Sequence, residues 1–244
     1  MSAVSLHARP SDSFAAKLAH TTAMLSAAAA EHGSRIVQAT SLGAEDMVIT
    51  DLIARWHLAV AIGTLDTGML HAETLAMIER IETHYGLHVE VMQPRGETVV
   101  HFVARHGERA MYESIELRKA CCAIRKLEPL GRLLEGKTAW VTGLRRDQSD
   151  NRAAVPFSEH EANGRLKLNP LADWTWGDVW HYIAINDVPY NPLHDQFYPS
   201  IGCAPCTRAI SLGEDFRAGR WWWENEAAKE CGLHVKPSAE GVAA

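Results

Sequence analysis

The sequence has few cysteines, no long apolar run and no excess of positive charge. Its 244 residues include only five cysteines, and 24 Lys and Arg against 30 Asp and Glu give a formal net charge of −6. This acidic balance argues against a general binder of nucleic acid or other polyanions, although a local basic pocket is still compatible with a small anionic substrate. We therefore expect a small-molecule partner and no nucleic acid.

The sequence also shows no hydropathy pattern typical of an export signal or a membrane-spanning segment. The first 20 residues lack a sustained apolar core behind a basic start, and the apolar run at 23–30 is too short to cross a bilayer. We therefore expect a cytoplasmic protein with no membrane partner. In a reducing compartment, cysteines are expected to bind metal or to take part in redox catalysis rather than to form a disulfide framework.

Strand-like and helix-like segments alternate along the chain, which predicts an α/β fold. Segment 35–56 has a buried strand pattern, a turn with Ser41 and Gly43, and then a helix. A second such unit has its turn at Asp66, and a further strand leads into an Arg-rich loop within 138–152. This alternation indicates a parallel sheet with helices on both faces, whose ligands lie at the carboxyl ends of the strands.

A later helix is expected to start at a capping box. Thr175 is followed three residues on by Asp178, the spacing at which the two residues cap each other's backbone. Trp176 and Trp180 lie one helical turn apart and are expected in the core. Upstream, Arg145 is equally compatible with a solvated surface and with a role at the substrate.

The five cysteines divide into two pairs and one single residue. Cys121 and Cys122 are adjacent, whereas Cys203 and Cys206 form a C-x-x-C pair, and four thiolates suit one site. Zinc usually takes pairs with two to four residues between the sulfurs, because both sulfurs must converge on one atom. Since adjacent side chains diverge in a helix or a strand, the pattern favours an iron–sulfur cluster, with zinc as the alternative.

Cys231 stands apart from these pairs. A lone cysteine is commonly a buried structural residue, but Lys229 and Glu230 beside it on a terminal segment favour an accessible nucleophile. Upstream, Arg217 and Arg220 are suited to binding sulfate or phosphate oxygens and to lowering the pKa of a nearby thiol.

Six motifs, taken in order, resemble one known family. They are SLGAED, LDTGMLHAET, RKACCAIRKLEPL, TGLRRDQS, SIGCAPCTR and GRWWWENEAAKECGLH. This set is similar to the assimilatory adenylylsulfate (APS) reductases, which are relatives of the phosphoadenylylsulfate (PAPS) reductases. The resemblance extends over residues 33–235, and the paired cysteines together with the terminal ECGLH are its most specific part.

The resemblance implies a fold, a cofactor and a reaction. The fold would be the adenosine nucleotide alpha-hydrolase-like (PP-loop) type with a mobile C-terminal segment, and the two cysteine pairs would hold a [4Fe-4S] cluster. The reaction would convert APS and reduced thioredoxin into sulfite, AMP and oxidised thioredoxin in sulfate assimilation. Cys231 would attack the sulfate sulfur, and a thioredoxin thiol would release sulfite from the S-sulfocysteine. A homo-oligomer is also expected.

The resemblance also assigns residues to the substrate. Lys126 is expected between cluster and substrate, the arginines at the phosphosulfate, and Asp66 and Gly143 at the adenosine. Many relatives have Ser-x-Ser-Gly where this chain has Thr-Ser-Leu-Gly, so either Thr40 or Ser41 is left to contact the phosphosulfate. The expected substrate residues are Ser41, Gly43, Asp66, Lys126, Gly143, Arg152, Arg217 and Arg220.

Three segments are expected on this basis. Residues 1–32 form an N-terminal helical segment, residues 33–210 form the nucleotide-binding and iron–sulfur domain, and residues 211–244 form a C-terminal arm with the catalytic cysteine. The chain is long enough and, at 47% apolar residues, apolar enough for one core with such an appendage.

Other functions are weighed against this one. A PAPS reductase or a dual APS/PAPS reductase is the runner-up, but such enzymes commonly lack the two cysteine pairs. An ATP pyrophosphatase would require a Ser-Gly-Gly-x-Asp-Ser loop, which SLGAED is not. A non-catalytic iron–sulfur sensor or scaffold belongs to a different class, and it would have no need of Cys231.

Overall fold

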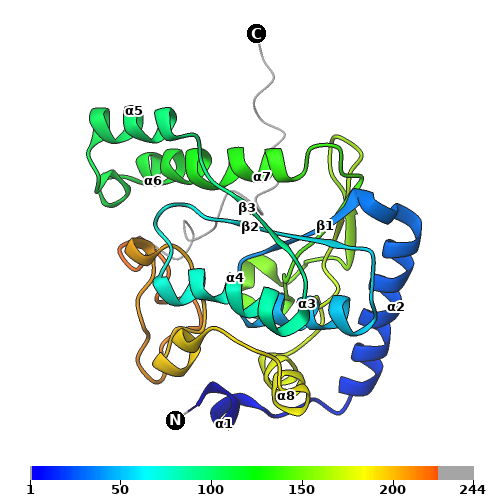
Figure 1. Cartoon of the computed structure of the whole chain (residues 1–244). Helices are drawn as coiled ribbons and strands as arrows, with labels where there is room; N and C mark the ends of the chain where they lie inside the picture. Colours follow the sequence, from blue (N-terminus) through cyan, green and yellow to red (C-terminus); the bar gives the residue numbers. More distant parts are fainter. Residues whose placement is uncertain (1, 225–244) are drawn as a thin grey trace.

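The computed structural model describes residues 2–224 and contains a mostly parallel sheet in that range (Figure 1). Its six strands lie in the order β3-β2-β1-β4-β6-β5. All neighbours pair in parallel except β5, which runs antiparallel to β6 at one edge. The strands are β1 (Ile36–Thr40), β2 (Ala61–Leu65), β3 (Val89–Met92), β4 (Ala139–Val141), β5 (Ser158–His160) and β6 (Leu166–Leu168).

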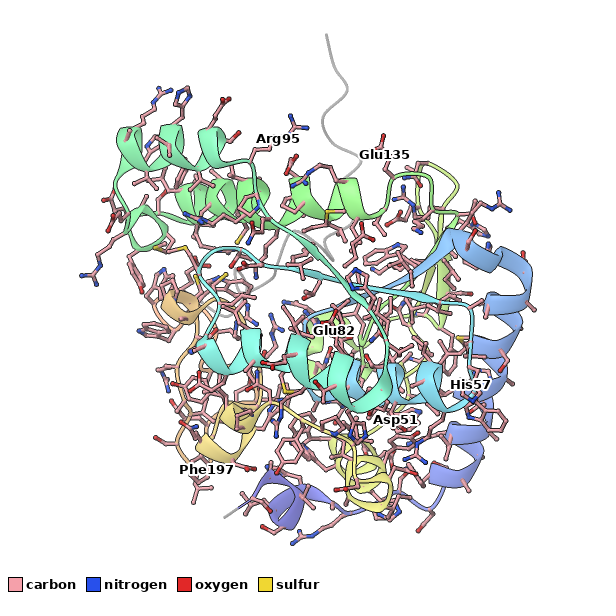
Figure 2. All side chains as sticks on the ribbon, viewed as in Figure 1. Asp51, His57, Glu82, Arg95, Glu135 and Phe197 are labelled. Carbon is pink, nitrogen blue, oxygen red and sulfur yellow. The ribbon has the colours of Figure 1, made fainter. Side chains whose placement is uncertain are left out.

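Helices cover both faces of this sheet, as the sequence predicts. Helices α3, α4 and α8 lie on one side, and α5, α6 and α7 lie on the other (Figure 1). Figure 2 labels Asp51 and Glu82 on the first side and Arg95 and Glu135 on the second. The helices are α1 (Ala3–His7), α2 (Phe14–His32), α3 (Ala44–Arg55), α4 (Ala72–Tyr85), α5 (Gly96–His106), α6 (Ile115–Cys122), α7 (Glu128–Leu133) and α8 (Trp176–Asn186).

The predicted strand–loop–helix units place their loops at one edge of the sheet. Strand β1 leads into α3 and β2 leads into α4, and both strands run parallel to β4 within the sheet. Parallel strands end at the same edge, so the three loops after them lie together. Gly86 ends α4 in the left-handed conformation with φ 67°, which glycine adopts without a Cβ clash.

The main core lies between the sheet and helices α2, α3 and α8. Trp174 is buried there and its indole N–H donates to the hydroxyl of Thr21 at 3.0 Å. Trp180 is fully buried, as expected, and meets Trp176 edge to face with ring centroids 5.4 Å apart. Trp176 is only partly buried, so the prediction of a core position holds fully for Trp180 and partly for Trp176. No helix within residues 2–224 is long and apolar enough to cross a bilayer.

The predicted capping box starts α8 and also ties the N-terminal segment to it. The hydroxyl of Thr175 accepts from the backbone N–H of Asp178, whose carboxylate accepts from the backbone N–H of Thr175. The same carboxylate accepts from Lys17 Nζ at 2.8 Å and from the backbone N–H of Ser11 at 2.7 Å. Burial opposes the charge, but these donors hold the pKa of Asp178 at about 2.

Gly177 in α8 lies directly against the N-terminal segment, where a Cβ would overlap the carbonyl oxygen of Arg9. We expect Gly177→Ala to lower the free energy of unfolding by about 1–3 kcal/mol, because a backbone oxygen cannot be moved as cheaply as a side chain. Gly131→Ala in α7 is the matched control, because its Cβ would meet nothing within 4 Å. Urea unfolding measures both, and equal stability of the two variants would contradict the expectation.

Candidate active site

A cavity opens at the carboxyl ends of β1, β2 and β4. The loops after these strands contribute to its wall, together with the stretch between α6 and α7 and two segments near residues 200 and 217. The chain thus brings together residues that are far apart in sequence at the edge where parallel sheets bind ligands. Seven of the eight expected substrate residues line this cavity: Ser41, Gly43, Lys126, Gly143, Arg152, Arg217 and Arg220.

Asp66 is the expected substrate residue that does not line the cavity. Its carboxylate accepts from the backbone N–H of Gly68 at 2.9 Å and from the side-chain amide of Gln93 at 2.8 Å. The carboxylate therefore closes its own turn after β2. The assignment of Asp66 to the adenosine stays a prediction.

The loop after β1 is held by a buried carboxylate, Asp46. Both the backbone N–H and the hydroxyl of Ser41 donate to Asp46 Oδ2 at 2.6 Å. A Cβ on Gly143 would lie 2.6 Å from Asp46 Oδ1, so the strand end approaches this carboxylate as closely as only glycine allows. Burial raises the pKa of Asp46 to about 6.

The two hydroxyls of this loop are occupied differently. Because Ser41 gives its one hydroxyl hydrogen to Asp46, its oxygen is left to accept. The hydroxyl of Thr40 accepts from the backbone N–H of Leu42 at 3.0 Å and, within the described part of the chain, donates to nothing. Leu42 has a positive φ of 62° at the position where many relatives have Ser, which is an unusual conformation for a non-glycine residue.

His194 also lines the cavity, although the sequence analysis did not single it out. Its Nε2 accepts from the backbone N–H of Ala44, the first residue of α3, at 3.2 Å. Burial lowers the pKa of His194 to about 4, so the ring is neutral near pH 7 and can act as this acceptor. No motif marks His194 in the sequence, because its partner is 150 residues away.

A buried ion pair joins two loops at the cavity, and one of its members, Glu45, lines the cavity. Arg145 is completely buried, and its Nε donates to Glu45 Oε1 at 3.0 Å. Its guanidinium also lies over the ring of Trp176, 5.3 Å from the centroid. The interpretation of Arg145 as a solvated surface residue is therefore wrong, because its charge is compensated inside the protein.

The four paired cysteines line a second, smaller cavity. Cys121 and Cys122 come from the end of α6, and Cys203 and Cys206 come from the loop that contacts the turn before α4, where the backbone N–H of Ala204 donates to Met69 O at 2.7 Å. Burial raises the pKa of the Cys206 thiol to about 12 and also raises that of Cys121. Residues 2–224 contain no group of three or more Cys, His, Asp or Glu arranged to hold a metal ion.

Lys126 lines both cavities and so stands at their boundary. It lies in a π-helical stretch, Ala123–Leu127, that follows the adjacent cysteines without a break in the helix. Such π-helical turns are rare and are frequently found at functional sites. The expected role of Lys126 between a cluster and the substrate stays a prediction.

Three arginines lie around the ring of Trp221. Arg118 and Arg220 each lie 4.6 Å from the centroid of its ring, and Arg217 lies 5.9 Å from it. Arg118 is buried and pairs with Glu224, with 2.8 Å between Nη2 and Oε2. Trp221 also lines the cysteine cavity, so one ring contacts the surroundings of both cavities. The sequence alone suggests only a core or interface role for the three consecutive tryptophans.

Cys231, the expected nucleophile, lies outside the described residues, as does most of the expected C-terminal arm. Residues 2–224 contain a single sheet. The division of the chain into segments at residues 32 and 210 stays a prediction.

The sequence model of the phosphoadenosine phosphosulfate reductase domain matches residues 35–209. The chain belongs to this family. It is 58% identical over 205 residues to the adenosine 5'-phosphosulfate reductase of Allochromatium vinosum, and the matched region covers 84% of this chain and 80% of the relative. It is 53% identical over 222 residues to the protein of the same name from Burkholderia cepacia, covering 91% and 88%. The resemblance drawn from the six motifs is thus confirmed.

Solved structures confirm the fold of this family member. The PAPS reductase of Candida auris in a phosphate complex matches with a TM-score of 0.60 and 30% identity over 70% of this chain and 81% of that chain. The FMN adenylyltransferase of Candida glabrata matches with a TM-score of 0.55 over 91% and 78% at 16% identity, which shows a shared fold alone. These neighbours support the predicted PP-loop type of α/β fold.

Two buried groups of the site should make stability depend on pH in opposite directions. As pH falls from about 6.5 to about 4, His194 protonates in the unfolded chain before it does so in the folded one, which destabilises the fold by up to about 3 kcal/mol. Over the same range folded Asp46 binds its proton first, which stabilises the fold by a similar amount.

Relative to the wild type, His194→Gln should therefore lose less stability on acidification from pH 7 to pH 4, and Asp46→Asn should lose more. Urea unfolding at a series of pH values measures these differences. Parallel curves for all three proteins would show that neither group has the shifted pKa given above.

Proposed function

We propose that this chain reduces APS to sulfite and AMP with thioredoxin as the reductant, as a step of sulfate assimilation. The position of Lys126 carries the proposal, because one cation borders both the cavity expected to hold the substrate and the cavity lined by four thiols. Eight curated relatives named adenosine 5'-phosphosulfate reductase, at 49–58% identity, support APS as the substrate. Thioredoxin is expected from the family resemblance.

The charges around the cavity suit a substrate with two anionic groups. APS carries negative oxygens on both phosphorus and sulfur, so an approaching thiolate is repelled unless cations neutralise them. Lys126, Arg152, Arg217 and Arg220 all line the cavity and bring positive charge to it. These residues bind and orient the phosphosulfate in the proposed reaction. The unassigned hydroxyl hydrogen of Thr40 favours Thr40 over Ser41 as the hydroxyl donor to it.

We propose that Cys121, Cys122, Cys203 and Cys206 hold a [4Fe-4S] cluster. Support comes from the common cavity that they line and from the cations beside it. Each thiolate of such a cluster binds a separate iron, so the four sulfurs need not converge on one atom as they must for zinc. The bound cluster would join α6 to the 203–206 loop, and its charge would act on Lys126 beside it.

The proposed nucleophile is Cys231. Its thiolate forms a bond to the sulfur of APS while the bond from that sulfur to the bridging phosphate oxygen breaks, and AMP leaves. One thioredoxin thiolate then attacks Cys231 Sγ and displaces sulfite, after which the second thioredoxin thiol closes the thioredoxin disulfide and restores Cys231. Thioredoxin thus supplies the two electrons that reduce sulfur from the sulfate to the sulfite level.

Three further predictions belong to this function. A cytoplasmic location agrees with the use of reduced thioredoxin, because the cytosol keeps thiols reduced. The homo-oligomer also stays a prediction, as does the choice of APS alone over dual use of APS and PAPS.

Anaerobic incubation with APS and no reductant should leave a covalent SO₃ adduct on the wild-type protein. Intact-protein mass spectrometry should show the added mass, which Cys231→Ser should lack and which thioredoxin should remove. Incubation with PAPS is run in parallel. An adduct from PAPS alone would assign the chain to the PAPS reductases, and no adduct from either nucleotide would favour the non-catalytic iron–sulfur protein.

Substituting a cysteine of the two pairs and substituting Cys231 should have different effects on the metal content of the protein. Cys203→Ser should lose most of the iron and acid-labile sulfide, because a buried ligand is removed, whereas Cys231→Ser should keep both. Elemental analysis of anaerobically purified proteins measures iron and zinc together. One zinc per chain in place of iron would support the zinc alternative.

A further inference from the structure

Gln148 lies between the buried ion pair and a cationic residue of the substrate cavity. It ends a short helical turn, Arg146–Gln148, in the loop after β4, and it lines the cavity together with Arg152. The proposed function assigns it no role. Its hydrogen bonds, however, fix the orientation of both ends of its amide.

The ion pair determines which end of the amide faces inward. Glu45 is 8% exposed and is bound by buried Arg145, so its carboxylate is held in place and can only accept hydrogen bonds. Gln148 Nε2 donates to Glu45 Oε1 at 2.9 Å and reaches Gly143 O at 3.3 Å. The reverse orientation would set two oxygens against each other, so the chemistry of Glu45 excludes it.

The amide oxygen must then face the other way. Gln148 Oε1 accepts from the backbone N–H of Arg145 at 3.1 Å and from Arg152 Nη1 at 2.6 Å. The second contact is short for an N–H···O bond, as expected for a charged donor. A continuous series of contacts thus runs from Arg145 through Glu45 and Gln148 to Arg152.

The amide oxygen of Gln148 is a neutral acceptor for Arg152, and a carboxylate in its place would act differently on an anionic ligand. Gln148 directs the guanidinium of Arg152 but adds no negative charge beside an anionic substrate. Glutamate would have nearly the same shape, yet it would set a second carboxylate beside Glu45 and repel phosphosulfate oxygens bound at Arg152. The residue type therefore matters as well as its position.

We infer that Gln148 is a positioning residue that orients Arg152 toward the phosphosulfate through the fixed carboxylate of Glu45. The inference rests on the proposed function, because it takes a phosphosulfate as the ligand. It predicts that the effect of changing Gln148 is transmitted by Arg152 and is specific to the anionic part of the substrate.

The test measures binding of APS by calorimetry in anaerobic Cys231→Ser protein, so that turnover does not interfere. In that background, Gln148→Glu should weaken APS binding by about 10- to 100-fold, and Gln148→Ala should weaken it less. Gln196→Glu is the charge control, because it adds the same charge at an exposed residue outside the cavity. It should leave APS binding within about twofold of the parent.

A double-mutant cycle with Arg152→Ala shows whether Arg152 transmits the effect. With Arg152 removed, Gln148→Ala should cause almost no further loss of APS binding. An equal loss in both backgrounds, or wild-type affinity of Gln148→Glu, would overturn the inference.

The unfolding midpoint and iron content of each variant show whether the fold and the cluster site are retained. If a Gln148 variant fails to fold, Gln148→Asn serves in its place, because it keeps the amide but shortens its reach. APS binding by the Cys231→Ser parent, together with no SO₃ adduct on the wild-type protein, would disprove the proposed reaction and still test Gln148. No APS binding by the parent would overturn both.

Discussion

The buried ion pair between Arg145 and Glu45 joins two of the segments that surround the cavity at the carboxyl ends of β1, β2 and β4. Arg145 follows β4 and Glu45 lies in the first turn of α3, so the pair fixes the spacing between two neighbouring strand ends. Removing one partner of such a pair typically costs about 3–5 kcal/mol, because the other charge is left buried and unpaired. The carboxylate of Glu45 also accepts a hydrogen bond from Gln148, which in turn accepts one from Arg152. The ion pair is thus connected to two residues that line the cavity.

The site concentrates positive charge in a chain that is acidic overall. Arg217 and Arg220 line the larger cavity and lie over Trp221, while Arg118 contacts the same ring beside the cysteine cavity. The faces of aromatic rings attract such cations. Arg118 also pairs with Glu224, which suits its complete burial. Packing against one tryptophan thus keeps three cationic groups close together beside the two cavities.

Much of the fold could be predicted from the sequence, because it depends on local patterns. The buried strand at 36–40, the helix that stops at Gly86 and the capping box of Thr175 and Asp178 each follow from residues close together in the chain. Trp176 shows the limit of such patterns, since helical spacing predicts a buried face but not how completely each residue on that face is buried.

For the site, the sequence determined which kinds of residue are present: four cysteines in two pairs, the arginines, and a lysine next to the cysteine pair. It also indicated that the loops after parallel strands meet at one edge. Tertiary structure alone decided that His194 accepts from Ala44 and that Arg145 is buried. The reason is physical, because hydrogen bonds and burial between residues 100 or more positions apart leave no periodic signal in the sequence.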